Sequence, residues 1–322
     1  MKYYRLKTKD PYYNLAVEEY LFDLGEDAVM LWQNEPSVVI GVNQNMRAEV
    51  DMAALSERGV HPVRRITGGG AVYHDDGNIN YTFIGKKEGG IDFQRFSSPI
   101  IEALASLGVT VMLSGRNDLC LPDGRKISGG AESVRGDSVL HHGTLLFNAD
   151  LDALGAILTP SPEKLATKAI KSTRSRVANI RELLPEIKSA EDLIDKIGEY
   201  AVRTLGAIPT EIPNDAKIYE LAKRNSSEEW LYPERGISSG VSLTRSRRYS
   251  FGEIKAEIVL RGERIEDIHI GGDFFGDEPV SILEQALRGS TMSTVDRVLS
   301  EELVSRAING MTKDMLISLI GE

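Results

Sequence analysis

The chain has 322 residues, of which 41% are apolar, and its formal net charge is −10 at pH 7. That charge argues against general attraction to nucleic acids or membranes, and the apolar runs are far shorter than the about 20 residues that a membrane span needs. The single cysteine, Cys120, excludes an internal disulfide, and the start of the chain lacks the apolar block of a signal peptide. We therefore expect a soluble cytoplasmic protein that binds neither membranes nor nucleic acids.

Short strands and helices alternate irregularly in the first half of the chain. Asn14 is predicted to cap a helix that stops at Gly25, and a second helix is expected to end at Gly59. A further helix is predicted at 96–107, and strand-like runs lie at 28–32, 37–42, 71–84, 109–113, 125–128 and 139–148. This order is typical of an α+β fold with a mixed, mainly antiparallel sheet.

The second half of the chain starts with a basic stretch and ends with a predicted hairpin followed by helices. Residues 161–181 carry six basic residues against one acid, and helices are expected from there to about residue 225. Apolar residues alternate from Ile254 to Leu260, which predicts a half-buried strand, followed by a hairpin turn at 261–264 and helices at 279–288, 293–308 and 312–320. We therefore place a large domain at 1–245 and a small α+β domain at 246–322.

The stretch VRRITGGGAVYHDDGNINYTF, from Val63 to Phe83, carries three consecutive glycines after an arginine pair. Glycine loses more backbone entropy on folding than other residues, so a triplet indicates that the chain needs positive φ or a close approach there. Exposed N–H groups of such a turn can bind an anion, and Arg64 or Arg65 can place a guanidinium on phosphate or carboxylate. Neither a Walker lysine nor a GxGxxG spacing is present. A tight turn beside a surface arginine pair is the alternative.

Two later segments carry further candidate residues. GRKISGGAE, at 124–132, places Lys126 beside a second glycine turn, and HHGTLLFNADLD follows at 141–152. His141 and His142 are neighbours in a predicted strand and must point to opposite faces, so they cannot form a two-histidine metal clamp. In the strand after the glycine triplet, alternation places Asn78, Asn80 and Thr82 on one face. We expect no metal site made of protein side chains alone, and no GxSxG nucleophile is present.

Together, these three segments resemble lipoate–protein ligases in their order and spacing. KLATKAIKSTRSRVANIRELLP (164–185) and HIGGDFFG (269–276) resemble later segments of the same family, so the resemblance covers nearly the whole chain. It implies that 1–245 is the catalytic domain, with the fold of biotin protein ligases, and that 246–322 is a small accessory domain. It also implies an enzyme that activates lipoate with MgATP to lipoyl-AMP. The lipoyl group would then pass to a lysine on lipoyl domains of 2-oxoacid dehydrogenase acyltransferase subunits or on the glycine-cleavage H protein.

The resemblance also assigns roles to individual residues. Lys126 matches the catalytic lysine that bridges the carboxyl and phosphate groups. The residues implied to bind ATP and the adenylate are Arg65, Gly70, Ala71, Val72, Tyr73 and Lys126. Those implied to bind lipoate are Arg65, Gly69, Gly70, His74, Lys126 and Gly129. Asn78, Asn117, Asp118 and His142 are expected near the site, Mg²⁺ is expected to arrive with ATP, and residues 162–181 match a mobile loop that covers the adenylate.

Two other functions are compatible with parts of the sequence. An octanoyl- or lipoyl-transferase of the same fold would act through a cysteine thioester and needs a nucleophilic thiol. Cys120 is the only candidate thiol, and it lies several residues after the position that the transferase cysteine occupies. A non-enzymatic nucleotide-binding regulator would use the basic stretch at 162–181, but it would leave Lys126 and the glycine turns unexplained.

Overall fold

The computed structural model describes residues 1–88, 92–158, 176–233 and 240–321. The chain divides into two compact units, of which the first comprises Met1–Val39, Arg47–Val63 and Val72–Ser227. The second comprises Ile40–Met46, Arg64–Ala71 and Glu228–Glu322. The domain boundary near residue 245 stays a prediction. Most of the basic stretch at 162–181 lies outside the described residues, which resume at Arg176.

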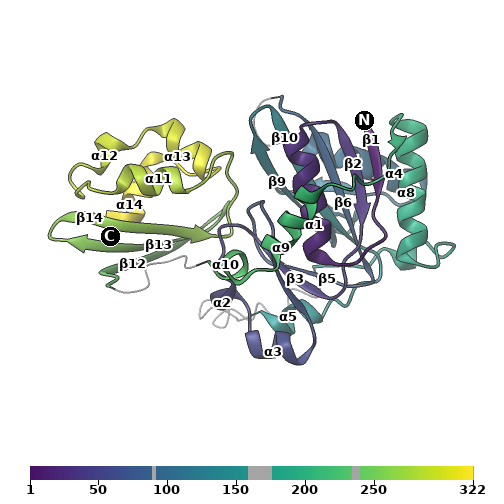
Figure 1. Cartoon of the computed structure of the whole chain (residues 1–322), viewed down its shortest axis with the longest axis horizontal. Helices are drawn as coiled ribbons and strands as arrows, with labels where there is room; N and C mark the ends of the chain where they lie inside the picture. Colours follow the sequence, from purple (N-terminus) through teal and green to yellow (C-terminus); the bar gives the residue numbers. More distant parts are fainter. Residues whose placement is uncertain (89–91, 159–175, 234–239, 322) are drawn as a thin grey trace. The chain divides into compact units, whose positions relative to one another are not determined.

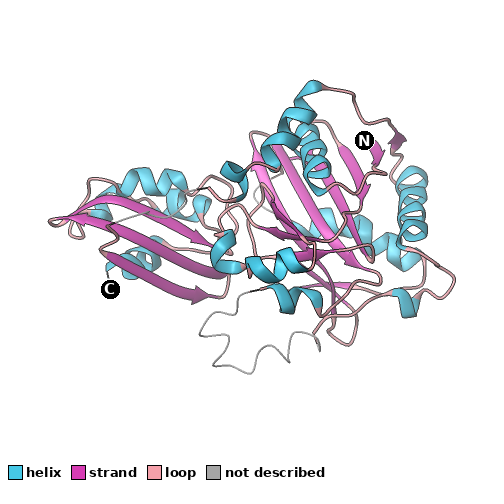
Figure 2. Ribbon diagram, turned by 60° about the horizontal axis from the view of Figure 1, so that its bottom comes forward, coloured by secondary structure: helices cyan, strands magenta, loops and turns pink. Residues whose placement is uncertain are grey.

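An eight-stranded sheet forms the centre of the first unit (Figures 1 and 2). The strands lie in the order β11 (Ile208–Pro209), β1 (Lys2–Arg5), β2 (Ala28–Trp32), β6 (Asn78–Lys86), β10 (Ser138–Leu146), β9 (Lys126–Arg135), β8 (Asp118–Cys120) and β7 (Met112–Ser114). Strand β1 pairs in parallel with β2 and β11, and the pairs from β2 to β7 are antiparallel. The prediction of a mixed, mainly antiparallel sheet in an α+β fold is confirmed.

Helices cover both faces of this sheet. Helices α4 (Phe93–Ser106) and α8 (Ala190–Thr204) pack on one face, where Ile100, Leu193 and Ile197 are almost fully buried in the main hydrophobic core. Helix α1 (Pro11–Leu24) lies on the other face, with α9 (Ala216–Asn225) beside it (Figure 1). The face under α1 is the one that carries Asn78, Asn80 and Thr82, because Ile79, Tyr81 and Phe83 belong to the main core. The alternation predicted for this strand is therefore confirmed.

The start of α1 differs from the prediction. Asp10, and not Asn14, caps the helix, because its carboxylate accepts hydrogen bonds from the N–H groups of Tyr12 and Tyr13. Asn14 lies inside the helix and is fully buried, and its side-chain amide donates to the carbonyl of Gln33 and to Asn34 Oδ1. The helix ends at Gly25, with φ of 65°, as predicted.

Short elements complete the first unit and lead into the second. Strands β4 (His61–Arg64), β3 (Ser37–Ile40) and β5 (Val72–His74) form a three-stranded sheet. The strand predicted at 71–84 is divided into β5 and β6 by a turn in which Gly77 N–H donates to Asp75 Oδ1. The short helices are α2 (Met46–Glu49), α3 (Met52–Glu57), α5 (Ala153–Ile157), η1 (Arg181–Leu183) and α10 (Glu228–Leu231).

The second unit contains a three-stranded antiparallel sheet and four helices after it. The strands are β12 (Leu243–Tyr249), β13 (Gly252–Arg261) and β14 (Arg264–Gly272), and the helices are α11 (Ser281–Leu287), α12 (Val295–Val298), α13 (Glu301–Ala307) and α14 (Lys313–Gly321). Ile254, Ala256 and Ile258 are fully buried, as their alternation predicts. Leu260 is only half-buried, because the pairing of β13 with β14 shifts register between Val259 and Leu260.

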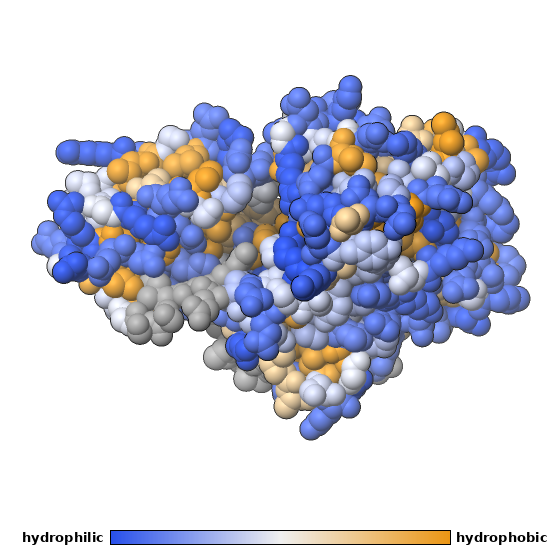
Figure 3. Space-filling view, in the orientation of Figure 1, coloured by the Kyte–Doolittle hydropathy of each residue, from blue (hydrophilic) through white to orange (hydrophobic). Residues whose placement is uncertain are grey.

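None of the described helices is long and apolar enough to cross a membrane. Hydrophilic residues cover most of the face shown in Figure 3, and apolar residues appear there in small groups.

Candidate active site

A β-bulge directly after Lys126 determines the face on which its side chain lies. The residues of β8 and β9 that pair are Asp118 with Gly129, Leu119 with Ser128, and Cys120 with Lys126. Ile127 therefore has no counterpart on β8. It is fully buried in the main core, and Ser128 Oγ lies 3.3 Å from Tyr81 Oη on the same side. Since a bulge re-aims the side chains around it, Lys126 and Gly129 come to share the opposite face, although they are three residues apart.

The Lys126 ammonium lies over Gly129 and against a carboxylate. Its Nζ is 2.8 Å from Asp118 Oδ1, and each of the two side chains is 35% exposed. A Cβ built on Gly129 would lie 2.9 Å from Nζ and 3.1 Å from Cε of Lys126, so the glycine leaves the space that the lysine occupies. Asn117 Nδ2 donates to the Gly130 carbonyl at 2.6 Å, and Gly130 N–H donates to the Asn117 carbonyl at 2.8 Å. Four predicted residues, Lys126, Gly129, Asn117 and Asp118, thus lie together.

The main chain of Lys126 is bonded to the segment that follows the undescribed residues. Lys126 N–H donates to the Arg176 carbonyl at 2.6 Å, and Ala178 N–H donates to the Lys126 carbonyl at 2.8 Å. Lys126 and Val177 thereby form a parallel bridge. The end of the segment predicted to cover the adenylate, residues 162–181, is therefore bonded to the strand that carries Lys126, while residues 162–175 of that segment lie outside the described residues.

On the same face of the sheet, a chain of buried hydrogen bonds runs from Trp32 to His142. Trp32 Nε1 donates to Thr82 Oγ1 at 3.0 Å, and Thr82 Oγ1 donates to Glu18 Oε1 at 2.6 Å. His142 Nδ1 lies 2.9 and 3.0 Å from the two Glu18 oxygens. The sequence interpretation named His142 but missed Glu18 and Trp32. A signal for Glu18 existed, since it lies three residues from Leu15 and from Leu21 on the apolar face of its helix.

The neighbouring histidine, His141, points to the opposite side and belongs to the core. Its Nδ1 lies 2.8 Å from Glu132 Oε1, and both side chains are fully buried. The ring stacks between those of Tyr81 and Phe96, with centroids 5.9 and 5.8 Å away. Burial lowers the pKa of His141, which keeps the imidazole neutral in the fold despite the adjacent carboxylate.

The other predicted residues of the first unit lie on β5 and β6. His74 is buried, and its Nδ1 accepts a hydrogen bond from Asn34 Nδ2 at 3.0 Å. Asn78 is fully buried, and its Nδ2 donates to Asn80 Oδ1 at 3.0 Å. Val72 and Tyr73 are half-buried on β5, where burial raises the pKa of the Tyr73 hydroxyl, with a smaller contribution from the charge of Asp75.

The arginine pair and the glycine turn belong to the second unit, where the two arginines bond to the protein's own main chain. Arg64, 1% exposed, donates to five carbonyls, which are those of Gly41, Val42, Gln44, Trp230 and Leu231. Arg65 donates from Nη2 to the carbonyls of Gly68 and Gly70, and from Nε to Thr67 Oγ1. Gly69 has a φ of 87°, and its N–H donates to the Phe274 carbonyl at 3.0 Å. Arg64 therefore has a structural role that the sequence did not reveal.

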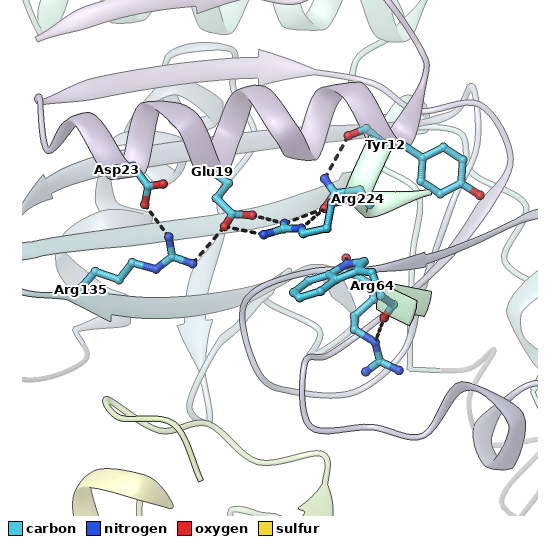
Figure 4. A network of polar contacts seen from close by, with 8 residues as sticks. Tyr12, Glu19, Asp23, Arg64, Arg135 and Arg224 are labelled. Carbon is cyan, nitrogen blue, oxygen red and sulfur yellow. Dashed lines mark hydrogen bonds and ion pairs between the residues drawn. The ribbon is translucent and has the colours of Figure 1, made fainter. Parts of the chain in front are cut away.

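Helix α1, which carries Glu18, is fixed to its neighbours by the adjacent glutamate (Figure 4). Glu19, 5% exposed, accepts hydrogen bonds from Arg224 of α9 and from Arg135, at the end of β9, which also donates to Asp23. Asn225 Nδ2 donates to the Tyr12 carbonyl at the other end of α1. Glu18 thus lies on a helix that the ion pairs of Glu19 with Arg135 and Arg224 fix in place. Figure 4 also shows Arg64, whose Nε donates a separate hydrogen bond to the Trp230 carbonyl at 2.9 Å.

Comparison with models of known families shows to which family the chain belongs. The model of the lipoyl protein ligase A/B catalytic domain matches residues 10–201, and the model of the bacterial lipoate protein ligase C-terminus matches residues 238–320. The chain belongs to the lipoate–protein ligase family. It is 38% identical to lipoate-protein ligase LplJ of Bacillus subtilis over 325 aligned positions, which cover 97% of each protein.

Solved structures of ligases have the same fold. A bipartite lipoate protein ligase from Thermoplasma acidophilum, described together with its E2 lipoyl domain, is 29% identical with a TM-score of 0.64 over 74% of this chain and 98% of that one. A lipoate-protein ligase A bound with ATP is 26% identical with a TM-score of 0.61, over 72% of this chain and 98% of that one. The lipoate-ligase fold expected from the sequence is confirmed.

Proposed function

We propose that this ligase activates lipoate with ATP to lipoyl-AMP and transfers the lipoyl group to a lysine of a protein acceptor. The family assignment and the names of the relatives support this function. The observation that carries the chemistry is the position of Lys126, which the bulge aims over Gly129 and away from the core.

The chemistry needs a cation at such a position. When the lipoate carboxylate attacks the α-phosphate, two anions meet, and at ~4 Å and an effective dielectric constant of about 20 each charge pair is repelled by about 4 kcal/mol. A lysine ammonium between them offsets this repulsion and then stabilises the charge that develops in the transition state. We assign this role to Lys126.

The remaining predicted residues keep their proposed roles. Arg65, Gly70, Ala71, Val72 and Tyr73 would contact ATP and the adenylate. Gly69, His74 and Gly129 would contact lipoate together with Arg65, Gly70 and Lys126. Arg65 could bind phosphate only by exchanging its bonds to the Gly68 and Gly70 carbonyls for bonds to the nucleotide. Asn78, Asn117, Asp118 and His142 would support the site from nearby.

The metal and the acceptor are proposed on chemical grounds. Among the described residues, no group of three or more His, Cys, Asp or Glu side chains could hold a metal ion. We propose that Mg²⁺ arrives with the phosphates of ATP. The proposed acceptors are lipoyl domains of 2-oxoacid dehydrogenase acyltransferase subunits and the glycine-cleavage H protein. The E2 lipoyl domain described with the archaeal ligase supports the first of these.

The test is to incubate the protein with MgATP, lipoate and a lipoyl domain and to measure the mass of the acceptor. We expect one lipoyl group per lipoyl domain, with release of pyrophosphate and no product when ATP is omitted. Octanoate in place of lipoate measures the acyl preference in the same assay. Unchanged acceptor mass with a folded enzyme and all substrates present would contradict the proposal.

The cysteine-dependent transferase is the alternative. Its only candidate thiol, Cys120, is 6% exposed in β8, a position typical of an inert core cysteine. Acyl transfer that needs no ATP would favour the transferase.

A further inference from the structure

The ion pair between Lys126 and Asp118 bears on a problem that the proposed reaction creates. Lipoyl-AMP is a mixed anhydride, and its acyl carbon is attacked by any uncharged amine within reach. The acceptor lysine is one such amine, and Lys126 is another, because its proposed role places Nζ beside the carboxyl–phosphate junction. A lysine that activates the carboxylate must therefore be prevented from becoming acylated itself.

The surroundings of Lys126 hold its ammonium in one place. Asp118 Oδ1 is 2.8 Å from Nζ, and both side chains are about one-third exposed, so solvent screens the pair only in part. The main chain of Asp118 is held in place on both sides. Asp118 lies opposite Gly129 in the pairing of β8 with β9, and the preceding residue, Asn117, makes two hydrogen bonds to Gly130. The missing side chain of Gly129 allows the lysine to lie flat against its own strand.

On the basis of the proposed function, we propose that Asp118 protects Lys126 from acylation by the enzyme's own lipoyl-AMP. An ammonium has no lone pair and cannot attack, and the Asp118 carboxylate, 2.8 Å from Nζ, holds the ammonium in an ion pair at one position. The carboxylate also accepts an N–H of the ammonium and so orients Nζ. Asp118 thereby decides which of two amines receives the lipoyl group.

Without Asp118, the side reaction would proceed as follows. The Lys126 ammonium loses a proton to buffer, and the lone pair of Nζ attacks the acyl carbon of lipoyl-AMP. The new C–N bond forms as the C–O bond to the phosphate breaks, AMP leaves with that electron pair, and the nitrogen loses a second proton to buffer. The products are AMP and a lipoyl amide on Lys126, which no longer carries a charge.

The experiment supplies lipoyl-AMP directly, without acceptor, to the wild type and to Asp118→Asn, and follows intact mass and tryptic peptides. We expect Asp118→Asn to acquire a lipoyl group on Lys126 at least about tenfold faster than the wild type, since release of Nζ from the ion pair lets it approach the acyl carbon, and a change in position of about 1 Å can alter a rate by as much as 10²-fold. The matched control is Asp123→Asn, which breaks an exposed ion pair with Arg125 in the next turn and leaves Lys126 untouched. Asp118→Asn combined with Lys126→Arg should remain unmodified at position 126.

A parallel arm adds lipoyl domain as acceptor and separates this proposal from the proposed function. If wild-type enzyme transfers lipoyl from lipoyl-AMP to the acceptor, the transfer step of the proposed function stands regardless of the behaviour of Asp118. Asp118→Asn that still lipoylates the acceptor while Lys126 stays unmodified would overturn the protective role. Asp118→Ser, checked for folding by circular dichroism, provides a second variant. Rapid acylation of Lys126 in wild-type enzyme without acceptor would also overturn the proposal, and this arm needs no variant at all.

Discussion

Gly68 lies against the main-chain carbonyl of Phe274, so closely that a Cβ on Gly68 would be 2.2 Å from that oxygen. Gly68→Ala must displace the main chain, and we expect a loss of about 1–3 kcal/mol in unfolding free energy, the range for overpacked sites. Gly70→Ala is the matched control, since its Cβ would meet only Asp273 Cβ at 3.9 Å. Urea unfolding of both variants measures the difference. Equal losses for the two would show that the close approach does not matter.

Lys126→Ala should lower the rate of adenylation by about 10²–10³, as expected for removal of one preorganised electrostatic donor. Lys126→Arg should recover little, because a planar guanidinium does not replace a compact ammonium. Pyrophosphate release with lipoate and MgATP is the measurement. Release at a near-normal rate by a folded Lys126→Ala protein would remove Lys126 from its assigned role.

Gly129→Ala tests the position of the lysine without removing its charge. The added Cβ would lie 2.9 Å from Nζ and must push the ammonium aside, and a displacement of about 1 Å can cost 10²-fold in rate. We expect adenylation to fall by about 10–10²-fold with little change in unfolding free energy. Gly155→Ala, where nothing lies within 4 Å, should leave the rate unchanged. Normal adenylation by Gly129→Ala would mean that this space is not needed.

Cys120→Ser should retain ATP-dependent lipoylation within a few-fold, because an adenylate mechanism needs no thiol. The side chain is buried, so a small loss of stability is expected from placing a hydroxyl there. Acceptor mass and protein melting temperature are measured together. Loss of transfer by a folded Cys120→Ser enzyme, with an acyl adduct on Cys120 in the wild type, would instead establish a thioester mechanism.

His141 should make the stability of the protein depend on pH. Burial lowers its pKa in the fold, whereas the unfolded chain titrates near the ordinary value of about 6.5. Below that pH the unfolded state binds a proton that the native state does not. The contribution of His141 to the unfolding free energy is therefore fully present above about pH 6.5 and is lost as the pH falls further. His141→Asn keeps a donor for Glu132 and does not titrate, so its unfolding free energy should fall less between pH 7 and pH 5. His61→Asn, which changes a partly exposed histidine, is the control. If the unfolding free energy of His141→Asn fell with pH as steeply as that of the wild type, His141 would not be the origin of the pH dependence.

The alternation of core-facing and outward-facing residues along strands predicted parts of the fold well. The faces of β6 and β13 follow from the alternation of residues such as Tyr81 and Thr82, because a strand turns by the same step at every residue. The end of α1 at Gly25 follows from the conformational freedom of glycine. Strand β1 and the capping by Asp10 were missed, because the first depends on pairing with β2 and the second on competition between nearby polar residues.

The candidate site was predictable in its residue types but not in its arrangement. Lys126, Asp118 and Gly129 could be named from motifs, and the structure places them within contact distance. That Arg64 bonds to carbonyls of Gln44 and Trp230 could not be read from the neighbouring residues, because its partners lie far away in the chain. The buried partner of His142, Glu18, is 124 positions away from it and was missed for the same reason.

The unpaired residue Ile127 makes chain length a part of the candidate site. Insertion of one residue between Lys126 and Gly129, with the bulge retained, would place these two residues on opposite faces of the strand and turn the lysine toward the hydrophobic core. A conservative exchange of Ile127 for valine would preserve the count and therefore the direction of Lys126. Sequences of this family should therefore tolerate substitutions in this short segment more readily than the insertion of a single residue, and an alignment that shows such an insertion would indicate a protein without this lysine chemistry.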